Sequence, residues 1–133
     1  MEANISNASL LNGLTLAYIG DAIYEVYIRN YVISLGYTKV NTIHKMVIKY
    51  TSGNAQASFI HYFLDNKILN EEEISIFKRG RNSHIKSNRK NINIQDYLDA
   101  TGFEALFGYL YLSNNIKRLE ELINIIIEYR KEC

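Results

Sequence analysis

The chain has 133 residues, of which 47% are apolar, with a formal net charge of +1, no proline and one cysteine, Cys133. This length suits a single domain with a substantial core. One cysteine excludes an internal disulfide and a cysteine-rich zinc site, as is usual in a reducing cytosol. The first residues lack the basic and apolar regions of a signal peptide, and no apolar run reaches membrane-spanning length. We therefore expect a cytoplasmic protein with no membrane partner.

The composition predicts an all-α fold. Proline interrupts helices and is absent, while Leu, Ile, Ala, Glu and Lys are abundant and strand alternation is hard to find. Long helices are predicted over residues 14–35, 40–50, 54–65, 95–112 and 116–130. Gly36 is expected to end the first of them, because glycine tolerates the left-handed conformation common at helix C-termini.

Two further expectations concern the local detail of these helices. The apolar stripe of the first helix is predicted to consist of Leu16, Ile19, Ile23 and Val26. A short additional helix is expected after Asn70, which can cap it in a capping box with Glu73. This helix is expected to end before Gly80.

The positive charge is concentrated in one segment. Six of the 15 basic residues fall within residues 78–90, where no acidic residue occurs, and the other nine stand against all 14 acidic residues. With its interspersed asparagines and serines, this basic segment is expected to be a flexible loop rich in donors for phosphate oxygens. A solvated loop that only offsets the acidic body explains the same composition equally well.

Two acidic residues, Asp21 and Glu104, lie in helices that otherwise read as apolar. Ionised carboxylates avoid apolar surroundings unless they are paired or bind a cation, so the two acids suggest one shared metal site. Small Ala17 and Gly20 beside Asp21 allow another helix to approach, and the helix of Glu104 is apolar nearly all round, as a central helix is. Spacing alone leaves open a second interpretation, in which each acid pairs with an arginine or caps a buried donor.

The segments around both acids resemble the catalytic domain of the ribonuclease III family. Residues 16–22 are similar to its signature helix, and residues 103–112 resemble its second acidic helix. The form of three motifs most resembles the Mini-ribonuclease III branch, and these motifs occupy residues 17–27, 77–82 and 100–104. The resemblance implies an all-α homodimer. It also implies a single catalytic domain over residues 1–133, without the separate double-stranded-RNA-binding domain of ordinary ribonuclease III.

By the same resemblance, Asp21 and Glu104 fall on the catalytic, Mg²⁺-binding acids of the family. The implied reaction is cleavage of double-stranded RNA in the maturation of 23S ribosomal RNA ends, leaving 5′-phosphate and 3′-hydroxyl termini, with a pre-ribosome or ribosomal protein as further context. Ordinary ribonuclease III carries two more acids where this chain has Ala17 and Thr101. Mg²⁺ commonly takes only one or two protein carboxylates and completes its shell with water and phosphate oxygens, so two acids can suffice.

The basic segment is the candidate RNA-binding surface, because the implied catalytic domain must hold the duplex itself. A-form RNA is recognised mainly through phosphates and 2′-hydroxyls. The residues expected to contact RNA are Lys78, Arg79, Arg81, Asn82, Lys86 and Arg89. Residues 51–57 offer further polar contacts, although capping of a helix explains Ser52 at least as well.

Two other functions stay open at the level of sequence. The first is a double-stranded-RNA-binding module with the same fold that has lost cleavage, motivated by Ala17 and Thr101. The second is a helical DNA-binding regulator, motivated by short helices beside a basic segment, although no persuasive recognition helix is present. The three histidines have no close metal-ligand spacing and are given no catalytic part.

Overall fold

The computed structural model describes residues 7–83 and 93–132, and every regular element within these ranges is helical. The elements are the 3₁₀ helix η1 (Ala8–Leu10) and the α-helices α1 (Gly13–Ser34), α2 (Val40–Thr51), α3 (Gly53–Asp65), α4 (Glu71–Arg81), α5 (Ile94–Leu112) and α6 (Ile116–Lys131). The all-α prediction is confirmed, and Gly36 follows α1 with a φ of 102°. None of the described helices is long and apolar enough to cross a membrane.

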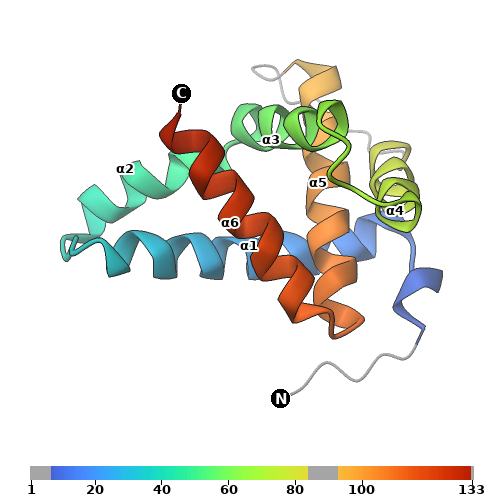
Figure 1. The fold of residues 1–133 in the computed structure, drawn as a ribbon, viewed down its shortest axis with the longest axis horizontal. Helices are drawn as coiled ribbons and strands as arrows, with labels where there is room; N and C mark the ends of the chain where they lie inside the picture. Colours follow the sequence, from blue (N-terminus) through green and yellow to red (C-terminus); the bar gives the residue numbers. More distant parts are fainter. Residues whose placement is uncertain (1–6, 84–92, 133) are drawn as a thin grey trace.

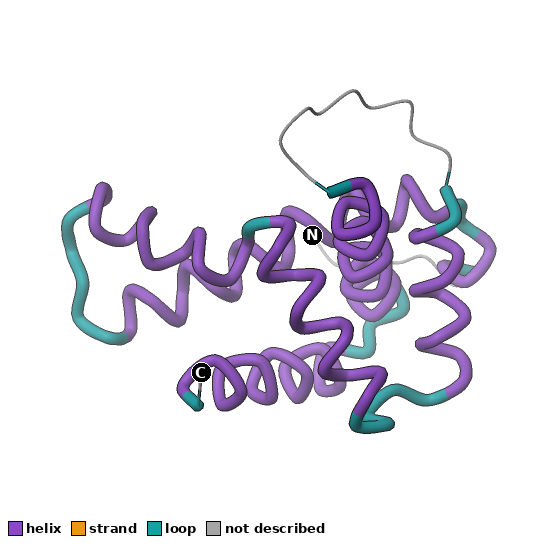
Figure 2. The backbone as a smooth tube through the Cα atoms, turned by 90° about the horizontal axis from the view of Figure 1, so that it is seen from above, coloured by secondary structure: helices purple, strands orange, loops and turns teal. Residues whose placement is uncertain are grey.

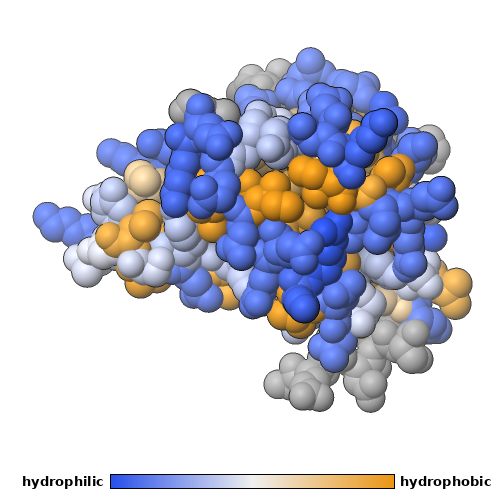
Figure 3. All heavy atoms as spheres, viewed as in Figure 1, coloured by the Kyte–Doolittle hydropathy of each residue, from blue (hydrophilic) through white to orange (hydrophobic). Residues whose placement is uncertain are grey.

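Helix α5 is the centre of the fold. It runs vertically in Figure 1 and is seen nearly end-on in Figure 2, where other helices lie around it. Its closest packing partners are α1, α4 and α3. Its side chains are buried on almost every side, so the prediction of a central helix around Glu104 is confirmed. Hydrophilic side chains cover most of the face in Figure 3, with a band of apolar side chains across its middle.

Aromatic side chains form the core between α1 and α5. The ring of Tyr24 lies 4.9 Å from that of Phe103 and 5.1 Å from that of Phe107, measured between centroids, and all three residues are fully buried. The hydroxyl of Tyr24 donates to the backbone oxygen of Tyr50 at 2.9 Å. Burial, with a smaller contribution from Tyr50, raises the pKa of Tyr24 well above its ordinary value. The hydroxyl therefore stays neutral and keeps its hydrogen bond.

Helices α1 and α5 cross with their backbones in contact, because each carries a glycine at the crossing. A Cβ added to Gly20 would overlap the carbonyl oxygen of Glu104 and lie 2.7 Å from its carbonyl carbon. A Cβ added to Gly108 would likewise overlap the carbonyl oxygen of Leu16. Only glycine fits at either position. The crossing brings Asp21, the neighbour of Gly20, next to Glu104.

The buried face of α1 differs from the predicted stripe. The buried row follows steps of four residues and consists of Leu16, Gly20, Tyr24, Ile28 and Val32. Val26 is 50% exposed, and Ile19 and Ile23 are only partly buried. Leu16 is fully buried as predicted, and Ile19 and Ile23 pack against the core from its edge, whereas the prediction was wrong for Val26. The prediction was based on the spacing of bulky aliphatic side chains. In the structure, the close crossing with α5 buries the row that contains Gly20.

Helix α4 begins as predicted but ends later. Asn70 and Glu73 form the expected capping box, each side chain accepting from the backbone N–H of the other. The helix continues through Gly80 to Arg81, so the expectation that it ends before Gly80 was wrong. A Cβ on Gly80 would lie 2.6 Å from the Cβ of Ala105 and 2.9 Å from the backbone of α5. This glycine permits close helix packing and does not terminate the helix.

Candidate active site

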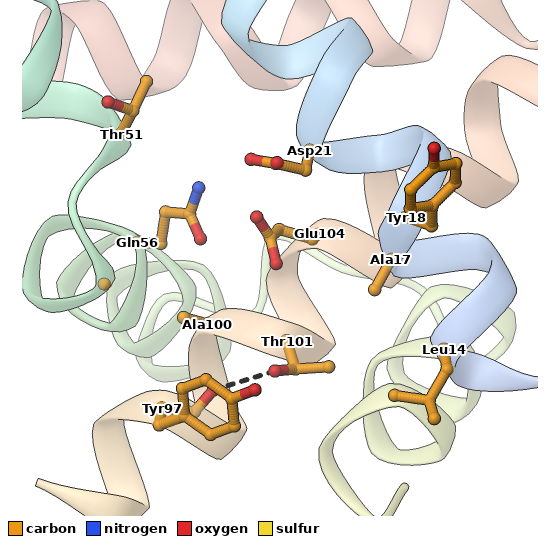
Figure 4. A pocket seen from close by; sticks show the side chains of 11 residues that line it. Leu14, Ala17, Tyr18, Asp21, Thr51, Gln56, Tyr97, Ala100, Thr101 and Glu104 are labelled. Atoms are coloured by element: carbon orange, nitrogen blue, oxygen red, sulfur yellow. Dashed lines mark hydrogen bonds between the residues drawn. The ribbon is translucent and has the colours of Figure 1, made fainter. Parts of the chain in front are cut away.

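A pocket of about 370 Å³ opens where α1, α5 and the start of α3 meet. Its lining comprises Leu14, Ala17, Tyr18 and Asp21 of α1, Thr51 at the end of α2, Gly53 and Gln56 of α3, and Tyr97, Ala100, Thr101 and Glu104 of α5. Asp21 and Glu104 point into the same space from their two helices (Figure 4). The structure thus brings together the two acids that the sequence singled out.

The two acids differ in their exposure. Asp21 is exposed at the mouth of the pocket, whereas Glu104 is half-buried on the central helix. The expectation that both carboxylates lie in apolar surroundings was therefore wrong for Asp21, because the face of α1 beyond the α5 crossing is uncovered in the single chain. Both side chains are carried by helix backbones that the glycine crossing locks together, so their relative position is set by the fold.

No lysine, arginine or histidine occurs among the described residues that line this pocket. An acid with an arginine partner is found elsewhere on α5, where buried Asp99 accepts from the Nε of Arg81 at 3.0 Å. The other oxygen of Asp99 lies 2.7 Å from the Nε2 of His61. Asp99 therefore joins α3, α4 and α5.

The donor set of the pocket fits a hard divalent cation. The carboxylates of Asp21 and Glu104 supply the oxygen ligands that Mg²⁺ prefers. Within the described part of the chain, no cluster of three or more His, Cys, Asp or Glu is arranged to hold a metal. A bound cation would therefore keep water or substrate oxygens in its remaining positions. The pocket wall also holds the buried amide nitrogen of Gln56, which has no hydrogen-bond partner among the described residues; as an N–H donor it needs an acceptor and is not a ligand for the cation.

Ala17 and Thr101, which replace two acids of ordinary ribonuclease III in the resemblance, both line this pocket. Ala17 brings no ligand atom. The hydroxyl of Thr101 donates to the backbone oxygen of Tyr97 at 3.0 Å, within its own helix (Figure 4). The pocket therefore retains two carboxylates at the positions where the resemblance places four.

The first part of the expected basic loop is helical. Lys78, Arg79 and Arg81 occupy the last turn of α4, and Asn82 caps it, so the expectation of a flexible loop from residue 78 was wrong for these positions. Basic side chains complement the negative end of a helix dipole, which favours helix here. Of the other expected RNA contacts, Lys86 and Arg89 lie outside the described residues.

The four expected RNA contacts that the structure describes have different surroundings. Lys78 and Asn82 are exposed. The guanidinium of Arg79 donates to the backbone oxygens of Ser9 and Leu11, the latter at 3.0 Å, and so holds the segment around η1 against α4. Arg81 is engaged with Asp99. Two of the arginines expected to bind RNA thus also hold the fold together.

Sequence reasoning passed over the position of Gln56. In the sequence Gln56 belongs to the polar run of residues 51–57, which suggests a helix cap followed by exposed polar side chains. In the structure Ser52 does cap α3, accepting from the N–H of Ala55 at 3.2 Å, but Gln56 is only 2% exposed. The available signal was its spacing of three, four and seven residues from the apolar residues Phe59, Ile60 and Phe63, which places it on the buried face.

Comparison with known proteins agrees with this fold and pocket. The model of the ribonuclease III domain family matches residues 14–115. The chain is 52% identical over 118 residues to the Mini-ribonuclease 3 of Enterococcus faecalis, covering 89% of each chain. It is 50% identical over 123 residues to that of Clostridium tetani, covering 92% of this chain and 80% of the relative.

A solved structure shows the same architecture. The crystal structure of a Fusobacterium nucleatum protein superposes with a TM-score of 0.81 at 32% identity, covering 91% of this chain and 95% of that one. The similarity in sequence and the similarity in fold to these proteins thus both extend over about nine-tenths of the chain. The protein belongs to the ribonuclease III family, as a member of its Mini-ribonuclease 3 branch.

Proposed function

We propose that the protein is an Mg²⁺-dependent endoribonuclease that cuts double-stranded RNA. Its proposed role is maturation of 23S ribosomal RNA ends in the cytoplasm, with products that carry 5′-phosphate and 3′-hydroxyl groups. Family membership supports the endoribonuclease class. The observation that carries the site assignment is the convergence of Asp21 and Glu104 on one pocket whose described lining holds no basic side chain.

In this proposal, Asp21 and Glu104 hold Mg²⁺ directly or through water. These two residues would hold the ion where, when bound, it would lower the pKa of a water and offset negative charge at the scissile phosphate. Asp21, exposed at the mouth, faces the incoming duplex, and Glu104 anchors the site on the central helix. The backbone contact between α1 and α5 keeps the two carboxylates in place before substrate arrives, which lowers the cost of reorganisation during the reaction.

The duplex is proposed to lie against the basic segment. Lys78 and Asn82 present exposed donors at the end of α4, and Lys86 and Arg89 stay part of the proposed surface. Arg79 and Arg81 use some of their N–H groups internally, but each guanidinium carries five donors, which leaves others for phosphate oxygens. A pre-ribosome or a ribosomal protein is proposed as the context in which the RNA is presented.

A homodimer is proposed because α1 carries an uncovered apolar row. Tyr18, Val26 and Ile33 are 83%, 50% and 54% exposed, and Ala22 completes the row at helical spacing. Exposed apolar rows of this kind mark association surfaces. The row lies beside Asp21, so two chains joined through it bring their pockets near one duplex, where each protomer of residues 1–133 cuts one strand.

The nuclease assay that tests this proposal compares a long RNA duplex, single-stranded RNA and duplex DNA, each with Mg²⁺ or with a chelator. We expect cutting of the RNA duplex alone, and only with Mg²⁺. Asp21→Asn and Glu104→Gln should each lower the cutting rate by at least about 100-fold, because each removes a metal-binding charge while leaving helix packing unchanged. Circular dichroism checks that both variants stay folded.

The matched control is Glu25→Gln, since Glu25 lies one turn from Asp21 on α1 but pairs with Arg29 at 2.6 Å outside the pocket. This variant should cut at the wild-type rate. Binding of the duplex without cutting would support the inactive module, and preference for DNA would support a regulator. For the ribosomal role, cutting of a precursor 23S duplex should produce the mature ends with 5′-phosphates; cuts elsewhere would contradict that role.

A further inference from the structure

Gln56 is a buried polar residue of the pocket that the two acids leave unexplained. It is 2% exposed and points from α3 into the space that Asp21 and Glu104 also face (Figure 4). Its amide nitrogen is buried and has no hydrogen-bond partner among the described residues. Native proteins rarely leave such a donor unsatisfied, because desolvation without a replacement partner is costly. A hydrogen-bond acceptor on a bound ligand would offset this desolvation cost.

The surroundings of Gln56 indicate what kind of partner it needs. Two other polar side chains of the pocket wall already donate their hydroxyl hydrogen within their own helices. Thr51 donates to the backbone oxygen of Val47 at 3.2 Å, and Thr101 donates to that of Tyr97 at 3.0 Å. The described lining has no lysine, arginine or histidine. The amide nitrogen of Gln56 is thus a buried donor still in need of an acceptor.

The position of Gln56 is also rigid. Its backbone N–H donates to the oxygen of Ser52 at 3.0 Å, and the Ser52 side chain caps the first turn of α3. Phe59, Ile60 and Phe63 anchor the same face of the helix in the core. An amide held in this way loses little further freedom when it binds an oxygen atom, which suits a group that positions a substrate.

An oxygen of a phosphodiester matches these features. An N–H donor pairs with the lone pairs of an anionic oxygen and is repelled by a cation. Under the proposed function, the scissile phosphate comes to rest in this pocket. We propose that Gln56 is a substrate-binding residue whose amide nitrogen donates a hydrogen bond to a non-bridging oxygen of that phosphate. This inference rests on the proposed function and adds a third group to the two acids.

The contact should act mainly on kcat. Negative charge on the phosphoryl oxygens is redistributed in the transition state, so a fixed donor contributes more there than in the bound duplex. Affinity for the duplex is spread over many backbone contacts, so the loss of one changes KM little.

The test compares Gln56→Met, which keeps the volume and removes the donor, with Gln56→Glu, which puts an anionic acceptor in its place. We expect Gln56→Met to lower kcat by roughly 10- to 100-fold with KM within about threefold, and Gln56→Glu to lower kcat at least as much. Gln95→Met is the matched control, because Gln95 is exposed on α5 and does not line the pocket. It should match the wild type. Thermal unfolding checks the fold of each variant.

A second measurement separates the phosphate contact from metal binding. The affinity of the free protein for Mn²⁺, followed by electron paramagnetic resonance, should be the same in Gln56→Met and wild type. A weaker affinity in Gln56→Met that Gln56→Glu restores would show that the amide oxygen binds metal, and would overturn the proposal. Should the methionine variant unfold, Gln56→Asn draws the amide back by one methylene and should show the same loss of kcat.

The outcomes distinguish this inference from the proposed function. If wild type and Gln95→Met cut the RNA duplex and Gln56→Met cuts it equally fast, only the role of Gln56 fails. If wild-type protein does not cut the duplex, the proposed function and the role of Gln56 fail together.

Discussion

Gly20 and Gly108 show how much of the site depends on single residues without side chains. Each stands where the backbones of α1 and α5 touch, and at each position a Cβ would overlap a carbonyl oxygen of the other helix. Asp21 and Glu104 adjoin this contact. The carboxylate pair therefore exists because two hydrogen atoms, in place of two methyl groups, let the helices approach.

Replacing Gly20 with alanine tests this dependence. In an isolated helix the change would favour helix formation, but here the methyl group has to push α1 away from α5. We expect Gly20→Ala to lower the free energy of unfolding by about 3 kcal/mol or more, measured by urea denaturation. Lys45→Gln, at an exposed position in the middle of α2, should change it by less than about 0.5 kcal/mol. Equal stability of Gly20→Ala and wild type would contradict the close crossing.

At the scale of elements, the end of α4 combines a structural and a proposed RNA-binding role. Arg81 reaches across to Asp99 on α5, which also contacts His61 on α3. Arg79 holds the segment around η1 through two backbone oxygens. Lys78 is exposed on the same helix. Helix α4 thus makes contacts within the fold and also presents an outward basic surface. Single substitutions can test these two roles separately.

We expect Lys78→Ala to weaken duplex binding and to reduce the slope of log affinity against log salt by about one, with unchanged stability. Arg81→Ala should also weaken binding, but in addition it should lower the free energy of unfolding by about 2 kcal/mol, because buried Asp99 loses a charged partner. Fluorescence anisotropy at several salt concentrations and urea denaturation measure the two effects. Unchanged binding and salt slope in Lys78→Ala would remove that residue from the interface.

At the scale of the whole molecule, the single chain leaves a row of apolar side chains on α1 exposed to solvent. Tyr18, Val26 and Ile33 face outward from the helix that carries Asp21. An enzyme that cuts both strands of a duplex needs two pockets, and in the proposed dimer this row joins two copies with their pockets adjacent. Association through α1 would therefore be part of the proposed activity.

Sedimentation velocity should find a dimer for the wild type at micromolar concentration. Val26→Glu places a charge in the middle of the apolar row and should shift the protein toward the monomer, because burying an unpaired charge in an interface is costly. Ile94→Glu changes a residue that is 70% exposed on a different helix, and it should leave the dimer intact. A monomeric wild type, or a dimeric Val26→Glu variant, would contradict the proposed interface.

Much of the fold was accessible from the sequence. The composition and apolar periodicity predicted the all-α class and five of the helices to within one residue at each end, because amphipathic periodicity and capping are local properties. The acids Asp21 and Glu104 were also recognisable, since charge in an apolar helix is a local anomaly. Their assignment to catalysis stays a prediction.

Tertiary structure alone decided which neighbours each residue meets. The sequence by itself determined where helices form and which residue types they carry. It indicated that another helix could approach Gly20, but not that this helix is α5. It also did not determine that Gly80 lies at a helix crossing, that Arg81 pairs with Asp99, or that Gln56 is buried beside the acids. These features depend on contacts between residues distant in the chain, and local periodicity contains no information about which faces of two helices meet.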